Sequence, residues 1–192
     1  CAGPPRRHRT HPRPSILPLQ LEAKRSVTIC ARAGQTGKST FALRYLVNGD
    51  FTARFVFDRE DEAAQRLGLS PTRSPYDLAV HLIRGWVLFD PHGMFPVNLD
   101  GALAFFCEWA YAKSSRLPGQ KILMIDEVWK FISTQRLPAE LATCLQTGCK
   151  RGLAMIFNTQ LPNWLHLAIR NECSEAVMFR LNDSSCLDFA VE

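Results

Sequence analysis

Residues 33–40 read Ala-Gly-Gln-Thr-Gly-Lys-Ser-Thr and follow a short apolar run, 27–31, that is typical of a buried strand. A glycine-containing turn between a strand and a helix presents backbone N–H groups that bind phosphate oxygens. We therefore predict a phosphate-binding loop in which Lys38 reaches the terminal phosphates and the hydroxyl of Ser39 ligates magnesium. The expected nucleotide-binding residues are Gly34, Gln35, Thr36, Gly37, Lys38, Ser39 and Thr40.

One position departs from the usual form of this motif. A glycine normally stands five residues before the Gly-Lys pair, and here that place is taken by Arg32. The structural alternative is a glycine-rich turn that precedes a helix without binding phosphate. The order of strand, turn, Gly-Lys-Ser-Thr and helix favours the phosphate loop. By itself, this motif indicates a nucleotide but not a reaction.

A second motif supplies carboxylates. The apolar residues 122–125 lead directly into Asp126 and Glu127. Such a run predicts a central parallel strand whose carboxyl end opens into the ligand crevice. We expect Asp126 to hold the water shell of a magnesium ion beside Ser39, and Glu127 to polarise the water that attacks the terminal phosphate. The alternative is a buried strand that ends in an acidic helix cap.

A third strand, predicted over 153–157, ends in Asn158, Thr159 and Gln160. Polar residues at the tip of such a strand lie beside the terminal phosphate in a doubly wound sheet. Gln160 is therefore the candidate sensor, which positions the attacking water and reports whether the phosphate is present. The alternative for a glutamine after a strand is an ordinary loop residue.

Strand and helix patterns alternate along the rest of the chain. This alternation predicts an α/β fold with a mostly parallel sheet and helices on both faces. Asp58 and Arg59, at the end of a predicted strand, are expected on the crevice side. Further strands are predicted over 54–57, 86–89 and 175–180, and helices over 38–47, 74–83, 99–113 and 164–170, the last of them capped by Asn163.

The 192 residues predict two regions. Residues 1–20 are rich in arginine and proline and are expected to form an extended tail, either a simple leader or a segment that docks on an anionic surface. Residues 21–192 are expected to form a single domain. No apolar run reaches about 18 residues, so no membrane span is predicted. Seven cysteines without a C-x-x-C pair predict reduced thiols, and magnesium bound with nucleotide is the one expected metal.

Together, the three motifs give the chain a resemblance to a known family. The phosphate loop, the stretch 122–127 and the segment 148–162, with its Gly-Cys-Lys-Arg-Gly start and its Thr-Gln-Leu-Pro end, resemble the HerA/FtsK superfamily of DNA-pumping ATPases. The similarity covers residues 26–183 and is strongest to the genome-packaging ATPases of icosahedral viruses with an internal membrane.

The resemblance implies a RecA/FtsK-like P-loop NTPase that hydrolyses ATP with Mg²⁺ and pumps double-stranded DNA into a preformed capsid. It further implies a ring, expected to be a hexamer, and capsid-vertex or viral membrane proteins as possible partners. The corresponding location is the virion vertex or the host cytoplasm.

The segment before the third strand departs from the family pattern. The family commonly has arginine after the glycine, where this chain has Cys149 followed by Lys150 and Arg151. Ring ATPases need a cation from the neighbouring subunit to stabilise charge on the transferring phosphate. Arg151 is our candidate for that cation, and a solvated basic turn is the alternative. Other candidates are Lys150, Arg116, Arg136 and Arg170.

Three further functions remain open at this stage. Zot-like ATPases of filamentous phages, which export single-stranded DNA, share the same core motifs. A P-loop kinase shares the phosphate loop but usually carries an arginine-rich lid, which is not evident between the last two predicted strands. An assembly protein that binds nucleotide only to stabilise its fold is the non-enzymatic alternative. A GTPase is disfavoured because no Asn-Lys-x-Asp motif occurs.

Overall fold

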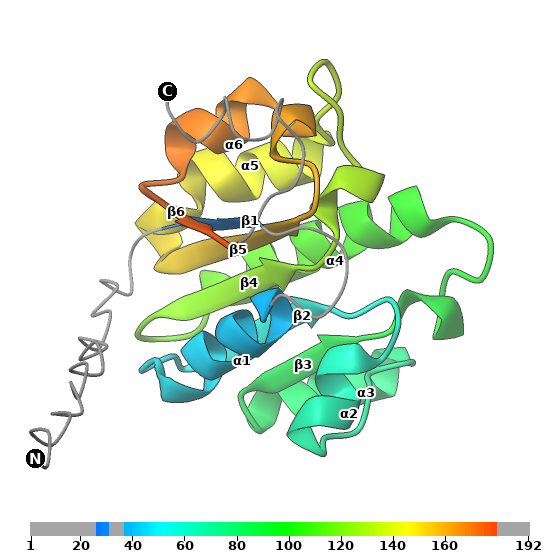
Figure 1. The fold of residues 1–192 in the computed structure, drawn as a ribbon. Helices are drawn as coiled ribbons and strands as arrows, with labels where there is room; N and C mark the ends of the chain where they lie inside the picture. The colour runs from blue at the N-terminus through cyan, green and yellow to red at the C-terminus, as the bar shows by residue number, and fades with distance from the viewer. Residues whose placement is uncertain (1–25, 31–36, 180–192) are drawn as a thin grey trace, which may run out of the picture.

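The computed structural model describes residues 26–30 and 37–179 (Figure 1). The predicted tail, 1–20, and the loop residues Gly34, Gln35 and Thr36 lie outside the described residues. Six strands form one sheet in the order β3-β2-β4-β5-β1-β6, and every pairing is parallel. The strands are β1 (Val27–Cys30), β2 (Ala53–Phe57), β3 (Trp86–Phe89), β4 (Lys121–Ile125), β5 (Leu153–Thr159) and β6 (Glu175–Met178).

Helices cover both faces of the sheet, as Figure 1 shows. They are α1 (Lys38–Asn48), α2 (Glu62–Leu67), α3 (Pro75–Ile83), α4 (Leu99–Ser114), α5 (Ala139–Thr147) and α6 (Leu167–Glu172). Helices α1 and α2 pack on one face, whereas α4, α5 and α6 pack on the other. The chain progresses toward β3 through α1 and returns toward β6 through α4, α5 and α6. Right-handed crossovers require this change of face when the direction reverses. The α/β fold with a parallel sheet is confirmed.

Alternate residues of the inner strands feed two hydrophobic cores. In β4, Leu123 and Ile125 join the core beneath α4 and α5, whereas Ile122 and Met124 join the core beneath α1. All four side chains are buried, because the strand is covered on both faces. The larger core includes an aromatic cluster in which Phe89 stacks on Phe106 with ring centroids 4.7 Å apart. These two cores fix the strands whose ends carry the polar motifs.

Most predicted elements have the expected bounds. Helix α3 begins as the Ser-Pro pair predicts, because the hydroxyl of Ser74 accepts a hydrogen bond from the backbone N–H of Asp77. The helix predicted to begin at Trp164 starts instead at Leu167, and the predicted cap by Asn163 is wrong. Residues Pro162–Trp164 form a 3-10 turn, and the ring of His166 caps α6 by accepting from the N–H of Ala168.

Gly152 supports a testable prediction about the turn before β5. It has a φ of +65°, and a Cβ there would lie 2.8 Å from the carbonyl oxygen of Gly119. Gly68 has a φ of +64° but nothing within 4 Å of an added Cβ. Both Gly→Ala changes carry the left-handed backbone cost of about 1–2 kcal/mol. We expect Gly152→Ala to lower the free energy of unfolding by roughly 1–3 kcal/mol more than Gly68→Ala, because it also overpacks the turn. Urea unfolding of the two variants measures the difference, and equal losses would contradict the predicted clash.

Candidate active site

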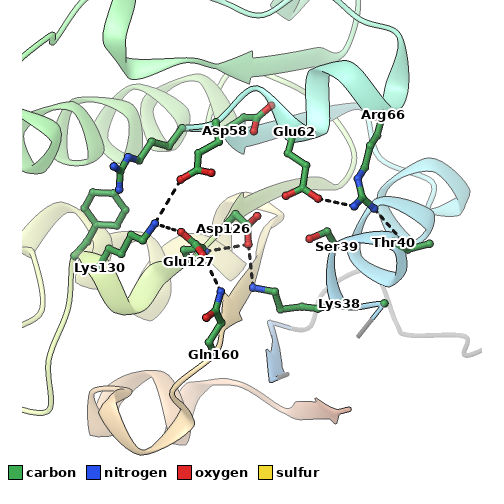
Figure 2. Close-up of a pocket in the computed structure, with 14 residues that line it drawn as sticks. Lys38, Ser39, Thr40, Asp58, Glu62, Arg66, Asp126, Glu127, Lys130 and Gln160 are labelled. Atoms are coloured by element: carbon green, nitrogen blue, oxygen red, sulfur yellow. Dashed lines mark hydrogen bonds and ion pairs between the residues drawn. The ribbon is translucent and has the colours of Figure 1, made fainter. Parts of the chain in front are cut away.

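A cleft of about 540 Å³ opens at the carboxyl ends of β2, β4 and β5, beside the N-terminus of α1 (Figure 2). Parallel strands end at the same edge of a sheet, so the residues that follow them converge there. The described residues that line the cleft are Gly37, Lys38, Ser39, Thr40, Asp58, Arg59, Glu60, Glu62, Arg66, Asp126, Glu127, Lys130, Phe131 and Gln160.

The N-terminus of α1 forms one wall of this cleft. Gly37 precedes the helix with a φ of 89°, and the first turn of α1 holds no acidic residue. Its positive dipole end therefore faces the cleft without a carboxylate from its own turn. Lys38 is only 8% exposed, and its Nζ lies 3.4 Å from Oδ1 of Asp126. Lys38, Ser39 and Thr40 thus line the cleft together, in an arrangement suited to bind an anion.

The acidic pair after β4 forms a tight turn. Oδ1 of Asp126 accepts a hydrogen bond from the backbone N–H of Glu127 at 2.9 Å. Glu127 has a φ of 48°, and Asp61 is the only other non-glycine residue with a positive φ among those described. A left-handed glutamate is uncommon and carries a backbone cost of order 1–3 kcal/mol. This conformation is one factor that directs both carboxylates into the cleft.

Gln160 reaches the same carboxylate from the end of β5. Its Nε2 donates a hydrogen bond to Oε1 of Glu127 at 2.8 Å (Figure 2). The structure thus joins two side chains that lie 33 positions apart and that the sequence motifs had selected separately. Gln160 belongs to the segment that leads toward α6. A movement of the Glu127 carboxylate can therefore be transmitted to that segment through the hydrogen bond.

Asp58 lies at the end of β2, where the sequence analysis expected it. It is 4% exposed, and one carboxylate oxygen accepts the backbone N–H of Ala64 at the start of α2. Burial raises the pKa of Asp58, the N–H groups of Ala64 and Ala63 partly offset that rise, and the nearby Asp61 and Asp126 add to it. Asp58 therefore brings a buried carboxyl group to the cleft, near the partly exposed carboxylate of Asp126.

The sequence analysis missed several charged residues of the cleft. Lys130 forms ion pairs with Glu127 and with Glu60, the latter at 3.5 Å. Arg66 pairs with Glu62 at 2.7 Å and donates to the hydroxyl of Thr40 at 3.0 Å. Lys130 was detectable in principle, because the third residue after Glu127 faces back toward it in a tight turn. The contribution of α2 was not, because that helix is only six residues long.

Arg151 lies away from this cleft. It ends the 3-10 turn Gly148–Arg151 before β5, at the edge of the sheet opposite to Gln160. Its guanidinium group stacks on the ring of Tyr111 at 3.7 Å from the centroid and donates to the Tyr111 carbonyl oxygen. A role for Arg151 in its own cleft is therefore incompatible with its position, whereas a role in a neighbouring subunit remains a prediction.

The side chains present in the cleft fit a magnesium ion. The hydroxyl of Ser39 and the carboxylate of Asp126 are hard oxygen donors of the kind that Mg²⁺ uses together with phosphate oxygens and water. Within the described residues, no group of three or more His, Cys, Asp or Glu side chains forms a metal site by itself.

The cysteines of the described segments, at 30, 107, 144, 149 and 173, are all unbridged thiols. No helix in the described part of the chain is long and apolar enough to cross a membrane.

The raised pKa of Asp58 predicts a pH-dependent contribution to stability. Because the folded state binds this proton more tightly than the unfolded state, the contribution is present below the unfolded pKa and is lost as pH rises through the folded pKa. We expect Asp58→Asn to become increasingly stable relative to the unaltered protein across that window, by about 1.4 kcal/mol per unit of pKa elevation.

Urea unfolding at a series of pH values measures this difference. Asp77→Asn is the matched control, because a hydrogen bond from the Arg73 N–H lowers the pKa of Asp77. The stability from Asp77 is present above its unfolded pKa and is lost on acidification, so the two variants should differ from the unaltered protein with opposite slopes. A difference for Asp58→Asn that does not vary with pH would contradict the prediction.

The architecture is similar to that of known NTPases. No family model matches the chain, and a search of curated proteins finds no match. Among solved structures, the genome packaging NTPase B204 from Sulfolobus turreted icosahedral virus 2 in complex with AMP matches with a TM-score of 0.66. The sequences are 16% identical, and the match covers 89% of this chain and 82% of that chain. B204 has also been solved with ATP-gammaS and with AMPPCP.

A second match is to a bacterial ATPase. The cytoplasmic domain of EssC superposes with a TM-score of 0.59 and 14% identity, over 88% of this chain and 35% of that chain. EssC ATPases 2 and 3 from Geobacillus thermodenitrificans give a TM-score of 0.58 and 15% identity, over 88% and 34% of the two chains. This chain therefore spans about a third of each EssC structure. Its fold is that of the P-loop NTPases, and its structure is similar to those of the B204 packaging NTPase and of the EssC ATPases.

Proposed function

We propose that this protein is an ATPase that drives the translocation of double-stranded DNA from within a ring of identical subunits, as in viral genome packaging. The observation that carries the proposal is the hydrogen bond between Gln160 and Glu127 inside the cleft that begins at Lys38. This hydrogen bond joins Glu127, the proposed base for the attacking water, to Gln160, which lies in the segment that leads to α6. Similarity of fold to the packaging NTPase B204 supports the choice of substrate.

The proposed reaction is hydrolysis of the terminal phosphate of ATP. The segment Gly34–Thr40, with Lys38, binds the phosphates. Ser39 and Asp126 would hold Mg²⁺, which would neutralise phosphate charge. Glu127 accepts a proton from water as the water oxygen bonds to the terminal phosphorus and the bond to the ADP oxygen breaks. Gln160 orients that water, and the contact of its side chain with the terminal phosphate is lost when the phosphate leaves. Movement of the segment beyond Gln160 is the proposed working stroke.

Arg151 is proposed to act on the neighbouring subunit's nucleotide. A guanidinium group placed near the transferring phosphate stabilises the charge that develops there. Its distance from its own cleft is consistent with action across a subunit boundary in a ring, expected to be a hexamer. The proposed location is a virion vertex or the host cytoplasm, with capsid or viral membrane proteins as partners.

Turnover of ATP tests the function directly. The rate per subunit should rise steeply with protein concentration and rise further with double-stranded DNA, because each site would be completed by a neighbour. The measurement is phosphate release over a range of protein concentrations, with duplex DNA, with single-stranded DNA and without DNA. Stimulation by single strands alone would favour an export ATPase, and flat, DNA-independent turnover would contradict translocation.

Glu127→Gln is the variant that tests the chemistry in the same assay. The new amide keeps an oxygen that can accept from Gln160 but cannot take the proton from water. We expect kcat to fall by about 100-fold or more, with ATP binding retained. Unchanged turnover would remove Glu127 from the mechanism. No turnover in the unaltered protein, alone or with DNA, would favour a nucleotide-stabilised assembly protein.

Subunit mixing tests Arg151. Arg151→Ala and Glu127→Gln should each be inactive alone, because one lacks the cation given to a neighbour and the other lacks the carboxylate of its own site. Mixed rings contain some interfaces with both groups intact, so activity should reappear on mixing. Arg136→Ala is the control, since Arg136 already pairs with Asp100 at 2.6 Å and is largely exposed. Failure of the mixture to recover activity would exclude Arg151 as the shared cation.

A further inference from the structure

Lys130 lies in the cleft, and its ammonium group contacts carboxylates from two separate connections. It belongs to the 3-10 turn Val128–Lys130 that follows Glu127. Its Nζ pairs with Oε2 of Glu127 (Figure 2). The same Nζ lies 3.5 Å from Oε1 of Glu60, which follows β2. The other oxygen of Glu127, Oε1, accepts from the amide of Gln160. The carboxylate of Glu127 is therefore held at both oxygens.

These contacts link the ends of three strands. Glu60 belongs to the connection after β2, Glu127 and Lys130 follow β4, and Gln160 follows β5. The side chains of Lys130 and Glu127 are 24% and 26% exposed, so the ion pair is partly shielded from water. Such a pair is less screened than one on the open surface. Glu60, at 66% exposed, is the weaker partner.

A glutamate needs such support to act on water. Its side chain has several rotatable bonds, and a general base must lie within hydrogen-bonding reach of the proton that it removes. Displacement of a reacting group by about 1 Å can cost about 100-fold in rate. The left-handed backbone at Glu127 sets the direction of the side chain, but not the position of its carboxylate. Two anchors at the two oxygens restrict that position.

Resting on the proposed function, we propose that Lys130 is a positioning residue for Glu127. Together with Gln160 it holds the carboxylate in the orientation from which it accepts a proton from the attacking water. The ion pair with Glu60 keeps the Lys130 ammonium group beside Glu127, so that it does not move to bind the nucleotide phosphates. Lys130 therefore acts through Glu127, whereas Lys38, which contacts Asp126, acts on the phosphates themselves.

The pairing itself is tested by thermal unfolding of Lys130→Met, Glu127→Gln and the double variant. If the two side chains interact, the changes in Tm are not additive, and we expect a discrepancy of about 1–3 °C. Additive changes would overturn the proposal. This measurement needs no enzymatic activity, so it decides the matter even if the unaltered protein does not hydrolyse ATP, which would overturn only the proposed function.

The consequence for the reaction is tested by kcat and by the dissociation constant of ATP. Lys130→Met should lower kcat by about 10- to 100-fold and leave ATP binding within about twofold, because the nucleotide contacts are unchanged. Lys130→Arg should restore most of the rate, since arginine also pairs with carboxylates. In the Glu127→Gln background, Lys130→Met should cause no further loss.

Lys113→Met is the matched control. The Nζ of Lys113 lies 5.8 Å from the ring centroid of Trp109, much as that of Lys130 lies 5.7 Å from the ring of Trp129, but Lys113 has no carboxylate partner among the described residues. The control variant Lys113→Met should leave kcat unchanged. Weakened ATP binding with unchanged kcat in Lys130→Met would indicate that Lys130 is a phosphate ligand. A raised kcat in Lys130→Met would indicate that Lys130 inhibits the reaction. Either result, or no change, overturns the positioning role.

Discussion

The parallel pairing of β4 with β2 and β5 is the constraint on which the cleft depends. In this register Phe57, Ile125 and Phe157 lie side by side, so Asp58 and Asp126 follow neighbouring positions at one edge of the sheet. β5 continues two residues beyond Phe157, which carries Gln160 past the edge and lets its amide reach Glu127. The two hydrophobic cores hold this register, because a slip of one residue would exchange their buried side chains.

Most charged side chains that line the cleft form ion pairs. Lys38 pairs with Asp126, Arg66 with Glu62, and Lys130 with Glu127 and Glu60. These pairs let ionised groups lie partly buried without an isolated charge. A triphosphate with Mg²⁺ would exchange partners: Lys38 would turn to phosphate oxygens and Asp126 to the metal and its water. Lys38 and Asp126 are already charged and partly buried before the nucleotide binds. They would only change partners, so most of the free-energy cost of burying additional charge would be avoided.

Much of the fold and of this site followed from the sequence, for identifiable reasons. The inner strands are continuous apolar runs that end in polar residues, and the fold rules then place Lys38, Asp126, Glu127 and Gln160 together. Sequence patterns are less informative where tertiary contacts decide the outcome. Helix α2 is too short to show a clear period, and the start of α6 depends on the ring of His166 rather than on Asn163. The spacing of Lys130 from Glu127 is compatible with their pairing, but a glutamate at position 127 does not by itself predict the left-handed turn that brings the two side chains together.

In the proposed mechanism, Lys130 would act within its own subunit's cleft, whereas Arg151 would act on the nucleotide of a neighbouring subunit. Lys130 is already engaged by two carboxylates, so its charge is largely committed within its own cleft. Arg151 is held at the opposite edge of the sheet by Tyr111, through a hydrogen bond to its carbonyl oxygen and a cation–π contact with its ring. Neither contact brings a negative charge, so the guanidinium group has no counter-ion among the described residues. A guanidinium group in that state keeps most of its attraction for a phosphate. If Arg151 acts on a nucleotide phosphate, that phosphate must belong to another subunit, because Arg151 lies far from its own cleft. Hydrolysis would then depend on assembly, which is the condition under which a ring of identical subunits can act in turn.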